Sequence, residues 1–316
     1  MRWVRYVTQG NTTPRCGVLE DGMVHALEPG TTLVDLLGDD GQRLAEAGER
    51  VLRHPVETVA VEQVRLLAPI AKPPAIRDGL CFLDHLRGIR RALGVSDELL
   101  PVWDEIPAFY FANPASVVGP YDDVAVPPGC TWFDLELEVA AVIGRAGRDL
   151  HPDRAESHIA GYMLLCDWSG RDLQFKELPL GIGQAKGKDS ATTLGPMLVT
   201  ADELEPFRRD GRLSIELRAT VNGEELTKGR LDQMDWTFGD LLAYASRGTE
   251  LAPGDVFGSG TVPGGCLLEH VDTPNPADFG RWLRPGDVVS LSGEGLGETR
   301  QRVVPGQPVH PLRSGH

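Results

Sequence analysis

The sequence is poor in cysteine and has no long apolar run, and each shortage excludes a class of protein. Cysteine occurs only five times, at widely spaced positions: Cys16, Cys81, Cys130, Cys166 and Cys266. An odd number of cysteines without a paired motif fits reduced thiols better than a disulfide framework or a zinc site. No apolar run approaches the ~20 residues that a membrane span needs, and the polar residues 1–5 are not a signal peptide. We therefore expect a soluble cytoplasmic protein.

Positive charge is also scarce. Lys and Arg together number 31 against 46 Asp and Glu, which gives a formal net charge of −15. This charge repels phosphate backbones and anionic membranes, so neither nucleic acid nor a membrane is an expected partner. The glycine-rich stretches 181–187 and 293–297 lack the strand–loop–helix context of a phosphate-binding loop, which excludes a nucleotide site. An acidic protein that binds a small anion must gather positive charge locally, through a metal ion or a few Lys and Arg side chains.

Turn and linker patterns divide the 316 residues into two domains. Residues 1–72 are expected to form a small, β-rich N-terminal domain, in which Asp21-Gly22 predicts a hairpin turn. The proline-bearing stretch 68–74 favours extended chain and indicates a linker. Residues 73–316 then form the main domain.

The main domain shows more strand and turn patterns than helical ones. Alternating residues lead into Asn222-Gly223, a typical hairpin turn, and resume beyond it. Thr237, with an acid three residues later, predicts the start of a helix. With 41% hydrophobic residues the chain can bury a substantial core. We expect an α+β fold that is mostly β.

The most informative segment, residues 132–144, places Glu136 and Glu138 two positions apart in an apolar, strand-like run. Residues i and i+2 of a strand point to one face, so the two carboxylates should lie side by side. If the strand is buried, the two like charges need a compensating cation. If it is an edge strand, its acidic face is simply hydrated, and this segment alone fits both interpretations equally.

A third acid favours the first interpretation. Asp167 ends a second apolar run, residues 161–167, in a setting similar to that of the two glutamates. Two Glu and one Asp make an all-oxygen donor set. Such a set suits a hard cation such as Mg²⁺, Mn²⁺ or Ca²⁺ rather than zinc.

At these residues the sequence resembles the fumarylacetoacetate hydrolase family. Residues 167–174 resemble the family's DWSARDxQ signature, and residues 187–192 resemble its Gly-Lys block. Residues 258–261 resemble its Gly-Thr loop, which is followed downstream by a glutamate, here Glu269. The similarity covers residues 75–305. It implies a small N-terminal domain, a main domain built as a mixed β-roll, and a homodimer.

The resemblance also implies a set of metal ligands. The family's Glu-x-Glu strand and later Asp match Glu136, Glu138 and Asp167. A further acidic ligand of the eukaryotic enzymes precedes the catalytic histidine by seven residues, and Asp78 and His85 have that spacing. The expected cofactor is Mg²⁺, with Mn²⁺ or Ca²⁺ as alternatives.

The same resemblance implies the catalytic residues of a hydrolase that cleaves a C–C bond in a 1,3-dicarbonyl substrate. His85 is the expected general base for water, and Glu269 fixes its tautomer. The side chains expected to stabilise the oxyanion or line the site are Lys188, Arg171, Gln174 and Thr261. A bound divalent ion would act as Lewis acid and template for the dicarbonyl.

Several of these residues have structural alternatives. His85 follows apolar residues and could be a partly buried structural histidine, and Glu269 alone would be taken for an acid at the end of a strand. Asp78 could form a local ion pair with Arg77.

The lysine and arginine assignments have alternatives of the same kind. Lys186 lies in the same glycine-rich turn as Lys188 and is its rival for the site. Arg171 and Asp189 could serve a structural ion pair.

The pocket positions depart from the family pattern and make the pocket more apolar. Gly170 replaces the usual Ala of the signature. The family arginine that binds the substrate carboxylate falls at about Gly94, with Arg90 and Arg91 only in the vicinity, and Pro263-Gly264 alters the loop after Thr261. Tyrosines that line the eukaryotic pocket are replaced by Leu80, Phe111 and Leu178.

Three functions remain open at this point. The first is hydrolysis of a small acylpyruvate, diketo acid or β-diketone. The second is a related reaction on the same scaffold, namely 2-oxo acid decarboxylation, hydration or enol–keto isomerisation. The third is metal binding without turnover, which the presence of Lys188, His85 and Glu269 argues against.

Overall fold

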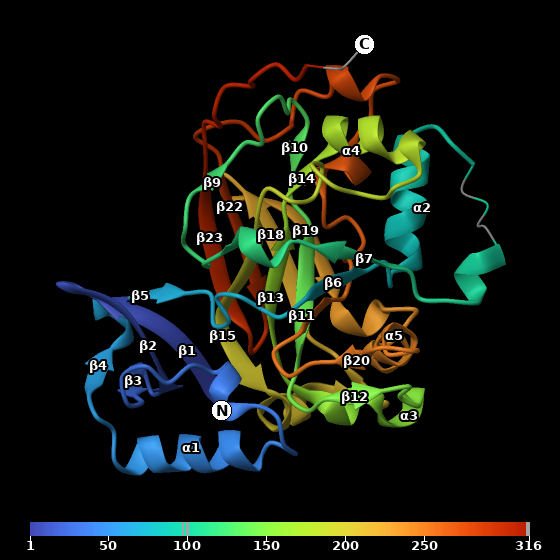
Figure 1. Ribbon diagram of the computed structural model, residues 1–316. Coiled ribbons are helices and arrows are strands. Elements are labelled where there is room, and N and C mark those ends of the chain that lie inside the picture. The colour runs from blue at the N-terminus through green and yellow to red at the C-terminus, as the bar shows by residue number, and fades with distance from the viewer. Residues whose placement is uncertain (97, 99–100, 314–316) are drawn as a thin grey trace.

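The computed structural model describes residues 1–96, 98 and 101–313. Strands predominate over helices, which confirms the expected α+β, mostly β fold. A 12-stranded sheet runs through the molecule in the order β4-β3-β2-β1-β15-β13-β11-β21-β6-β7 (Figure 1), with β5 beside β1 and β8 beside β15. No helix of the described residues is long and apolar enough to cross a membrane.

The N-terminal segment supplies one end of this sheet and lies at the lower left of Figure 1. Residues Asp21 and Gly22, both at positive φ, form the predicted turn between β2 and β3. The elements of this segment are β1 (Arg2–Thr8), β2 (Asn11–Glu20), β3 (Met23–Ala26), α1 (Gln42–Arg53), β4 (Thr58–Ala60) and β5 (Val64–Leu67). Strand β1 pairs antiparallel with β15, so the sheet continues without a break into the rest of the chain.

Seven strands complete the large sheet. They are β15 (Thr192–Thr200), β13 (Ile159–Asp167), β11 (Leu137–Ile143), β21 (Val256–Gly258), β6 (Ile76–Gly79), β7 (Phe109–Ala112) and β8 (Val117–Val118). Strand β11 is buried along its whole length. Because successive side chains of a strand point to opposite faces, Val139 and Ala141 pack into one core and Ala140 and Val142 into another, which the N-terminal segment shares.

A second sheet, in the order β19-β18-β22-β23-β9, covers the first of these cores. Its strands are β9 (Val124–Ala125), β18 (Glu216–Val221), β19 (Glu224–Arg230), β22 (Val288–Gly293) and β23 (Gly297–Val304). The predicted turn at Asn222-Gly223 joins β18 to β19 with both residues at positive φ. Short strands elsewhere are β10 (Phe133–Asp134), β12 (Gly147–Arg148), β14 (Ser169–Gly170), β16 (Arg208–Arg209), β17 (Arg212–Leu213) and β20 (Glu250–Leu251).

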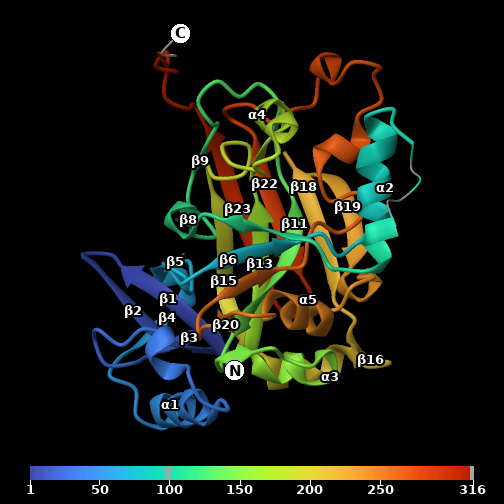
Figure 2. The ribbon, with the colours of Figure 1, turned by 45° about the vertical axis from the view of Figure 1, so that its right-hand side comes forward.

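The helices lie around the sheets. They are α2 (Leu83–Ala92), α3 (Pro152–Ala155), α4 (Arg171–Glu177) and α5 (Phe238–Ala245). Thr237 caps α5 as predicted, in a capping box with Asp240. Helices α2 and α4 lie at the end of the molecule away from α1 (Figures 1 and 2). This end carries most of the candidate site residues.

Candidate metal and catalytic site

Four acidic side chains, which we call the carboxylate cluster, meet on one face of the large sheet: Asp78, Glu136, Glu138 and Asp167. Asp78 lies on β6, Glu138 on β11 and Asp167 at the end of β13, while Glu136 immediately precedes β11. Each of the four is at most 5% exposed. The edge-strand interpretation is therefore excluded, and the cluster is a concentration of buried charge that needs compensation.

A glycine on the strand between them lets two of these carboxylates approach. Gly258 of β21 pairs with Asp78 on one side and with Ala140 of β11 on the other. A Cβ atom on Gly258 would lie 2.2 Å from Asp78 Oδ1 and 2.8 Å from Glu138 Oε2. Both contacts are too close for any side chain, so the absence of a Cβ here creates the space in which the two carboxylates meet.

The cluster divides into oxygens that are satisfied and oxygens that are not. Asp78 Oδ1, Glu138 Oε2 and Asp167 Oδ1 are buried and accept no hydrogen bond from any residue that the structure describes. Burial raises the pKa of Glu138 well above its usual range, and the nearby Asp78 adds to the shift. Burial likewise raises the pKa of Asp78 and that of Asp167. Buried, unpaired carboxylate oxygens are costly and require an explanation.

Lys188 donates hydrogen bonds to two other oxygens of the cluster. Its Nζ donates to Glu136 Oε2 and to Asp167 Oδ2, each at 2.5 Å, and the residue is 4% exposed. The neighbouring Asp167 and Glu136 raise the lysine's pKa despite burial, so Lys188 is charged. Its rival Lys186 is exposed and pairs with Asp189 at 2.6 Å, so the cavity lysine is Lys188.

Arg171, the first residue of α4, is a second buried cation against the cluster. Its Nε donates to Asp134 at 2.8 Å and its Nη2 to Glu136 at 2.6 Å. Burial alone would raise the pKa of Glu136, but Lys188 and Arg171 outweigh burial and hold that pKa below its usual range. Glu136 is therefore ionised and firmly held.

Three further side chains bound the site. Tyr110 of β7 lies beside Asp78 in the sheet register, and its hydroxyl donates to Asp167 Oδ2 at 2.7 Å. Thr261 donates to Glu138 Oε1 at 3.3 Å. Gln174 accepts from Arg171 Nη1 at 3.1 Å, one turn along α4. The hydroxyls of Tyr110 and Thr261 hold Asp167 and Glu138 in place but carry no charge that would neutralise them.

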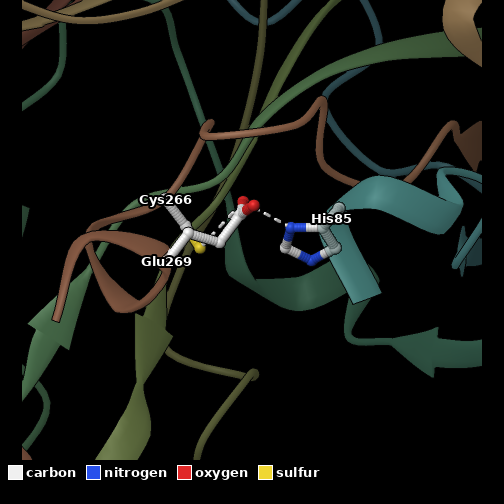
Figure 3. Close-up of side chains that lie close together, drawn as sticks. All are labelled: His85, Cys266 and Glu269. Carbon is white, nitrogen blue, oxygen red and sulfur yellow. Dashed lines mark hydrogen bonds and ion pairs between the residues drawn. The ribbon is translucent and has the colours of Figure 1, made fainter. Parts of the chain in front are cut away.

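His85 and Glu269 form a hydrogen-bonded pair beside the cluster (Figure 3). The two residues are 184 positions apart in the sequence, and His85 Nδ1 lies 2.7 Å from Glu269 Oε1. An ionised carboxylate can only accept, so this bond assigns the proton to Nδ1 and leaves the Nε2 lone pair free. Gly88 of α2 permits the approach, because a Cβ there would lie 2.4 Å from Glu269 Oε2.

Glu269 has two more donors. The backbone N–H of Gly264 donates to Oε2 at 3.0 Å, and Cys266 Sγ donates to Oε1 at 3.6 Å. Burial raises the pKa of Cys266 well above its usual value, so the thiol stays neutral and can donate. The ligand atoms of His85, Cys266 and Glu269 all lie within 4.8 Å of one another. Their mixed nitrogen, sulfur and oxygen donors contrast with the all-oxygen carboxylate cluster.

A cavity of about 340 Å³ joins the two groups. Eight of the ten predicted site residues line it: Asp78, His85, Glu136, Glu138, Arg171, Gln174, Lys188 and Thr261. Asp167 and Glu269 do not line it but contact it through Lys188 and His85 respectively. Residues that are far apart in the sequence thus form one concave site.

The structure excludes one alternative and corrects one expectation about neighbouring residues. Arg77 pairs with Asp255 at 3.0 Å and not with Asp78, because the two adjacent residues of β6 point to opposite faces. Phe111, expected in the pocket, is 68% exposed beneath the Arg77 guanidinium. Its neighbour Tyr110 lines the cavity instead. Leu80 and Leu178 do line the cavity.

Sequence reasoning missed Tyr110, Asp134 and Cys266. Asp134 lies two residues before Glu136 in the same alternating run and could have been identified from that spacing. Tyr110 carries no local pattern, and Cys266 was only one of five isolated cysteines.

The carboxylate cluster fits a hard divalent cation. Its donors are all oxygen, three of those oxygens have no hydrogen-bond partner, and Gly258 leaves room where two of them meet. The residues positioned to hold such an ion are Asp78, Glu138 and Asp167, with Glu136 alongside.

The chain is similar to several known proteins in sequence and in fold. The chain is 30% identical over 268 residues to human mitochondrial oxaloacetate tautomerase FAHD2A, covering 84% of this chain and 78% of the relative. A solved fumarylacetoacetate hydrolase from Exiguobacterium antarcticum is 27% identical, with a TM-score of 0.74 and coverage of 96% and 99%. The fold also matches maleylpyruvate hydrolase from Sphingobium sp. SYK-6, solved in complex with manganese(II) ion and pyruvate. That likeness has 21% identity and a TM-score of 0.71, and it covers 97% of this chain and 100% of the other.

Two family models account for most of the chain. A model described as "Rv2993c-like, N-terminal" matches residues 1–69. The model of the fumarylacetoacetate (FAA) hydrolase C-terminal domain matches residues 75–304. With this match over more than half of its length, the chain belongs to the fumarylacetoacetate hydrolase family.

Proposed function

We propose that the protein is a divalent-metal-dependent hydrolase that cleaves a C–C bond of a small 1,3-dicarbonyl compound. The observation that carries the proposal is the position of His85. Glu269 holds its Nδ1 at 2.7 Å, and the residue lines the same cavity as the carboxylate cluster. A base fixed in one tautomer, facing a site that can hold a metal ion, is the arrangement that water activation needs.

The metal ion would be held by Asp78, Glu138 and Asp167, with Glu136 as a fourth carboxylate. Mg²⁺ and Mn²⁺ are the preferred candidates, and Ca²⁺ is an alternative. When bound, the ion supplies Lewis acidity and a template for the two carbonyl oxygens. The unpartnered oxygens of the cluster support this assignment.

In the proposed reaction His85 Nε2 takes a proton from water as the water oxygen attacks one carbonyl carbon. Lys188, whose ammonium has a third N–H beyond its two carboxylate bonds, and Gln174 donate to the oxygen that becomes negative. The C–C bond to the central carbon then breaks, and His85 returns its proton to that carbon. The products are a carboxylic acid and a methyl ketone, which balances one water consumed. Arg171 keeps Glu136 ionised and in place, and Thr261 orients Glu138.

A second candidate is enol–keto tautomerisation of a 2-oxo acid. The oxaloacetate tautomerases among the relatives favour it, and His85 could move a proton between oxygen and carbon without any water attack. Decarboxylation and hydration of a 2-oxo acid are further alternatives on the same scaffold.

One experiment separates these reactions. Acylpyruvates, oxaloacetate and β-diketones are incubated with the Mn²⁺- or Mg²⁺-loaded protein, and the products are identified by mass spectrometry. Hydrolysis gives two products whose masses sum to the substrate mass plus 18, and decarboxylation releases CO₂. Tautomerisation leaves the mass unchanged and alters only the absorbance of the enol. His85→Ala should lower hydrolysis about 10²–10⁴-fold while metal binding is retained, and the exposed His151→Ala serves as control. Full activity in EDTA-treated protein or in His85→Ala would contradict the proposal.

The cytoplasmic location, the homodimer and the division at residues 72 and 73 remain predictions. Several similar proteins are described as mitochondrial, so similarity alone does not assign the compartment. Light scattering on the purified protein tests the homodimer directly.

A further inference from the structure

The residues that line the cavity include charged and apolar ones. The charged or titratable ones are the three carboxylates Asp78, Glu136 and Glu138 together with His85, Arg171 and Lys188. The apolar ones, which we call the apolar wall, are Leu80, Leu86, Ile89, Ala108, Phe109 and Leu178. Ile89 lies four residues after His85 on the same face of α2, and Leu86, next to His85, also lines the cavity. Leu178 is 44% exposed and therefore lies at the mouth of the cavity.

Among the described residues that line this cavity, Arg171 and Lys188 are the only Lys or Arg. Both are already engaged. Arg171 bonds Asp134, Glu136 and Gln174. Lys188 bonds two carboxylates. The remaining N–H of Lys188 serves the reacting oxygen in the proposed reaction, so a carboxylate placed against the apolar wall would have no counter-charge among the described lining residues.

The charge balance of the site leads to the same result. When the carboxylates are ionised to hold a metal ion, the cluster and Asp134 bring five carboxylates against the two cations Arg171 and Lys188, an excess of three negative charges. A divalent ion neutralises two of these charges. One carboxylate or enolate of a substrate can then bind the ion directly, whereas a second anionic group would be repelled and desolvated without compensation.

We propose that the substrate carries an uncharged, apolar group at the end remote from its dicarbonyl unit, and that a second carboxylate at that end is rejected. The proposal rests on the proposed function and narrows its substrate class to acylpyruvates with an alkyl or aryl acyl group and to comparable apolar β-diketones. Leu86, Ile89 and Leu178 are the specificity-determining residues. The chain then differs in substrate from enzymes whose substrates are dicarboxylates.

The test compares two matched ligands that need no turnover. 2-Oxohexanoate and 2-oxoadipate have the same six-carbon chain and differ only in a terminal methyl against a terminal carboxylate. Calorimetry with the Mn²⁺-loaded protein should give 2-oxohexanoate about tenfold tighter binding, because only its terminus suits an apolar wall. Equal or tighter binding of 2-oxoadipate would overturn the proposal, as would a lack of binding by both ligands.

Two variants test the residues of the wall. Leu178→Arg, at an exposed position that tolerates the change, should lower the preference for 2-oxohexanoate at least fivefold by giving the carboxylate a partner. Ile89→Arg should act in the same direction. Val95→Arg adds the same charge at a residue that is 48% exposed and lines no part of the cavity, so it should leave the preference unchanged. An unchanged preference in both wall variants, with normal circular dichroism, would overturn the assignment. If the protein binds 2-oxohexanoate more tightly than 2-oxoadipate but cleaves no dicarbonyl compound, only the proposed function is contradicted.

Discussion

Two kinds of carboxylate serve the same cavity, and they differ in how their oxygens are satisfied. Both oxygens of Glu269 have protein donors, which come from His85, Gly264 and Cys266. In the carboxylate cluster, Asp78, Glu138 and Asp167 each leave one buried oxygen without a donor. A fully satisfied carboxylate can position a neighbouring side chain. An incompletely satisfied set instead provides binding capacity for a cation from outside the chain.

The same contrast exists within the cluster over only two residues. Lys188 and Arg171 hold the pKa of Glu136 low, whereas burial and Asp78 raise that of Glu138. Two glutamates from one strand segment thus differ because their partners come from different parts of the chain. The predictions below test this contrast, from the largest expected effect to the smallest.

The largest effect is expected for Lys188→Met. The substitution leaves Glu136 and Asp167 without their shared cation, and breaking such a buried ion pair costs about 3–5 kcal/mol. Urea denaturation of the metal-free protein measures the loss. Lys186→Met, which removes an exposed pair with Asp189, should change the free energy of unfolding by less than about 1 kcal/mol. Similar losses in both variants would contradict the buried network.

Glutamine at the two neighbouring glutamates should have opposite effects on the stability of the metal-free protein. Glu138→Gln removes a carboxylate whose ionisation is disfavoured and should stabilise by about 1–2 kcal/mol. Glu136→Gln removes the partner of two buried cations and should destabilise by about 3 kcal/mol. Thermal unfolding in EDTA measures the change in stability of both variants. Glu138→Gln should also weaken Mn²⁺ binding, which calorimetry measures. Changes in stability of the same sign in both variants would refute the contrast between the two glutamates.

The metal-free protein should lose stability as pH rises. Asp78, Glu138 and Asp167 have raised pKa values, so their protonated forms favour the folded state. Their contribution is fully present below the unfolded pKa of about 4 and is lost as pH rises toward the folded values. The lowered pKa of Glu136 makes the folded state more stable as pH rises, but this is one group against three with the opposite effect. The melting temperature in EDTA should fall by a few degrees from pH 5 to pH 8, and Mn²⁺ should reduce this slope. A melting temperature that rises with pH would count against the assignment.

The smallest effect is expected at the satisfied carboxylate. Cys266→Ala removes one donor from Glu269 and leaves the bond to His85 intact. We expect kcat/KM to fall about fivefold, the equivalent of one neutral hydrogen bond, and the acidic limb of the pH–rate profile to shift. Cys130→Ala is the control, because the donors to Glu269 among the described residues are His85, Gly264 and Cys266. A rate loss with no change in the pH profile would assign Cys266 a packing role only.

Local features of this molecule could be predicted from the sequence, and long-range ones only through the family resemblance. Asp21-Gly22 and Asn222-Gly223 form the expected turns because Asp, Asn and Gly adopt positive φ more readily than other residues. The exposure of Phe111 depends on which face of β7 is turned inward, and a shift of one residue reverses that face.

Pairings across the chain had no local pattern to indicate them. The Arg77–Asp255 pair joins residues 178 positions apart. The opposite pKa directions of Glu136 and Glu138 depend on Lys188 and Asp78, which lie far from them in sequence. Such contacts are determined by how the sheet closes and not by the residues beside them.

The pairing of β1 with β15 limits how the protein can be shortened. Trp3 of β1 lies opposite Leu198 of β15, in a core that both segments share. A fragment that starts at residue 73 would expose the backbone donors and acceptors along this stretch of β15 together with apolar side chains. Open edges of this kind recruit strands from other molecules. We therefore expect the isolated main segment to aggregate on expression, and we expect charged substitutions along the exposed part of β15 to be necessary for its solubility.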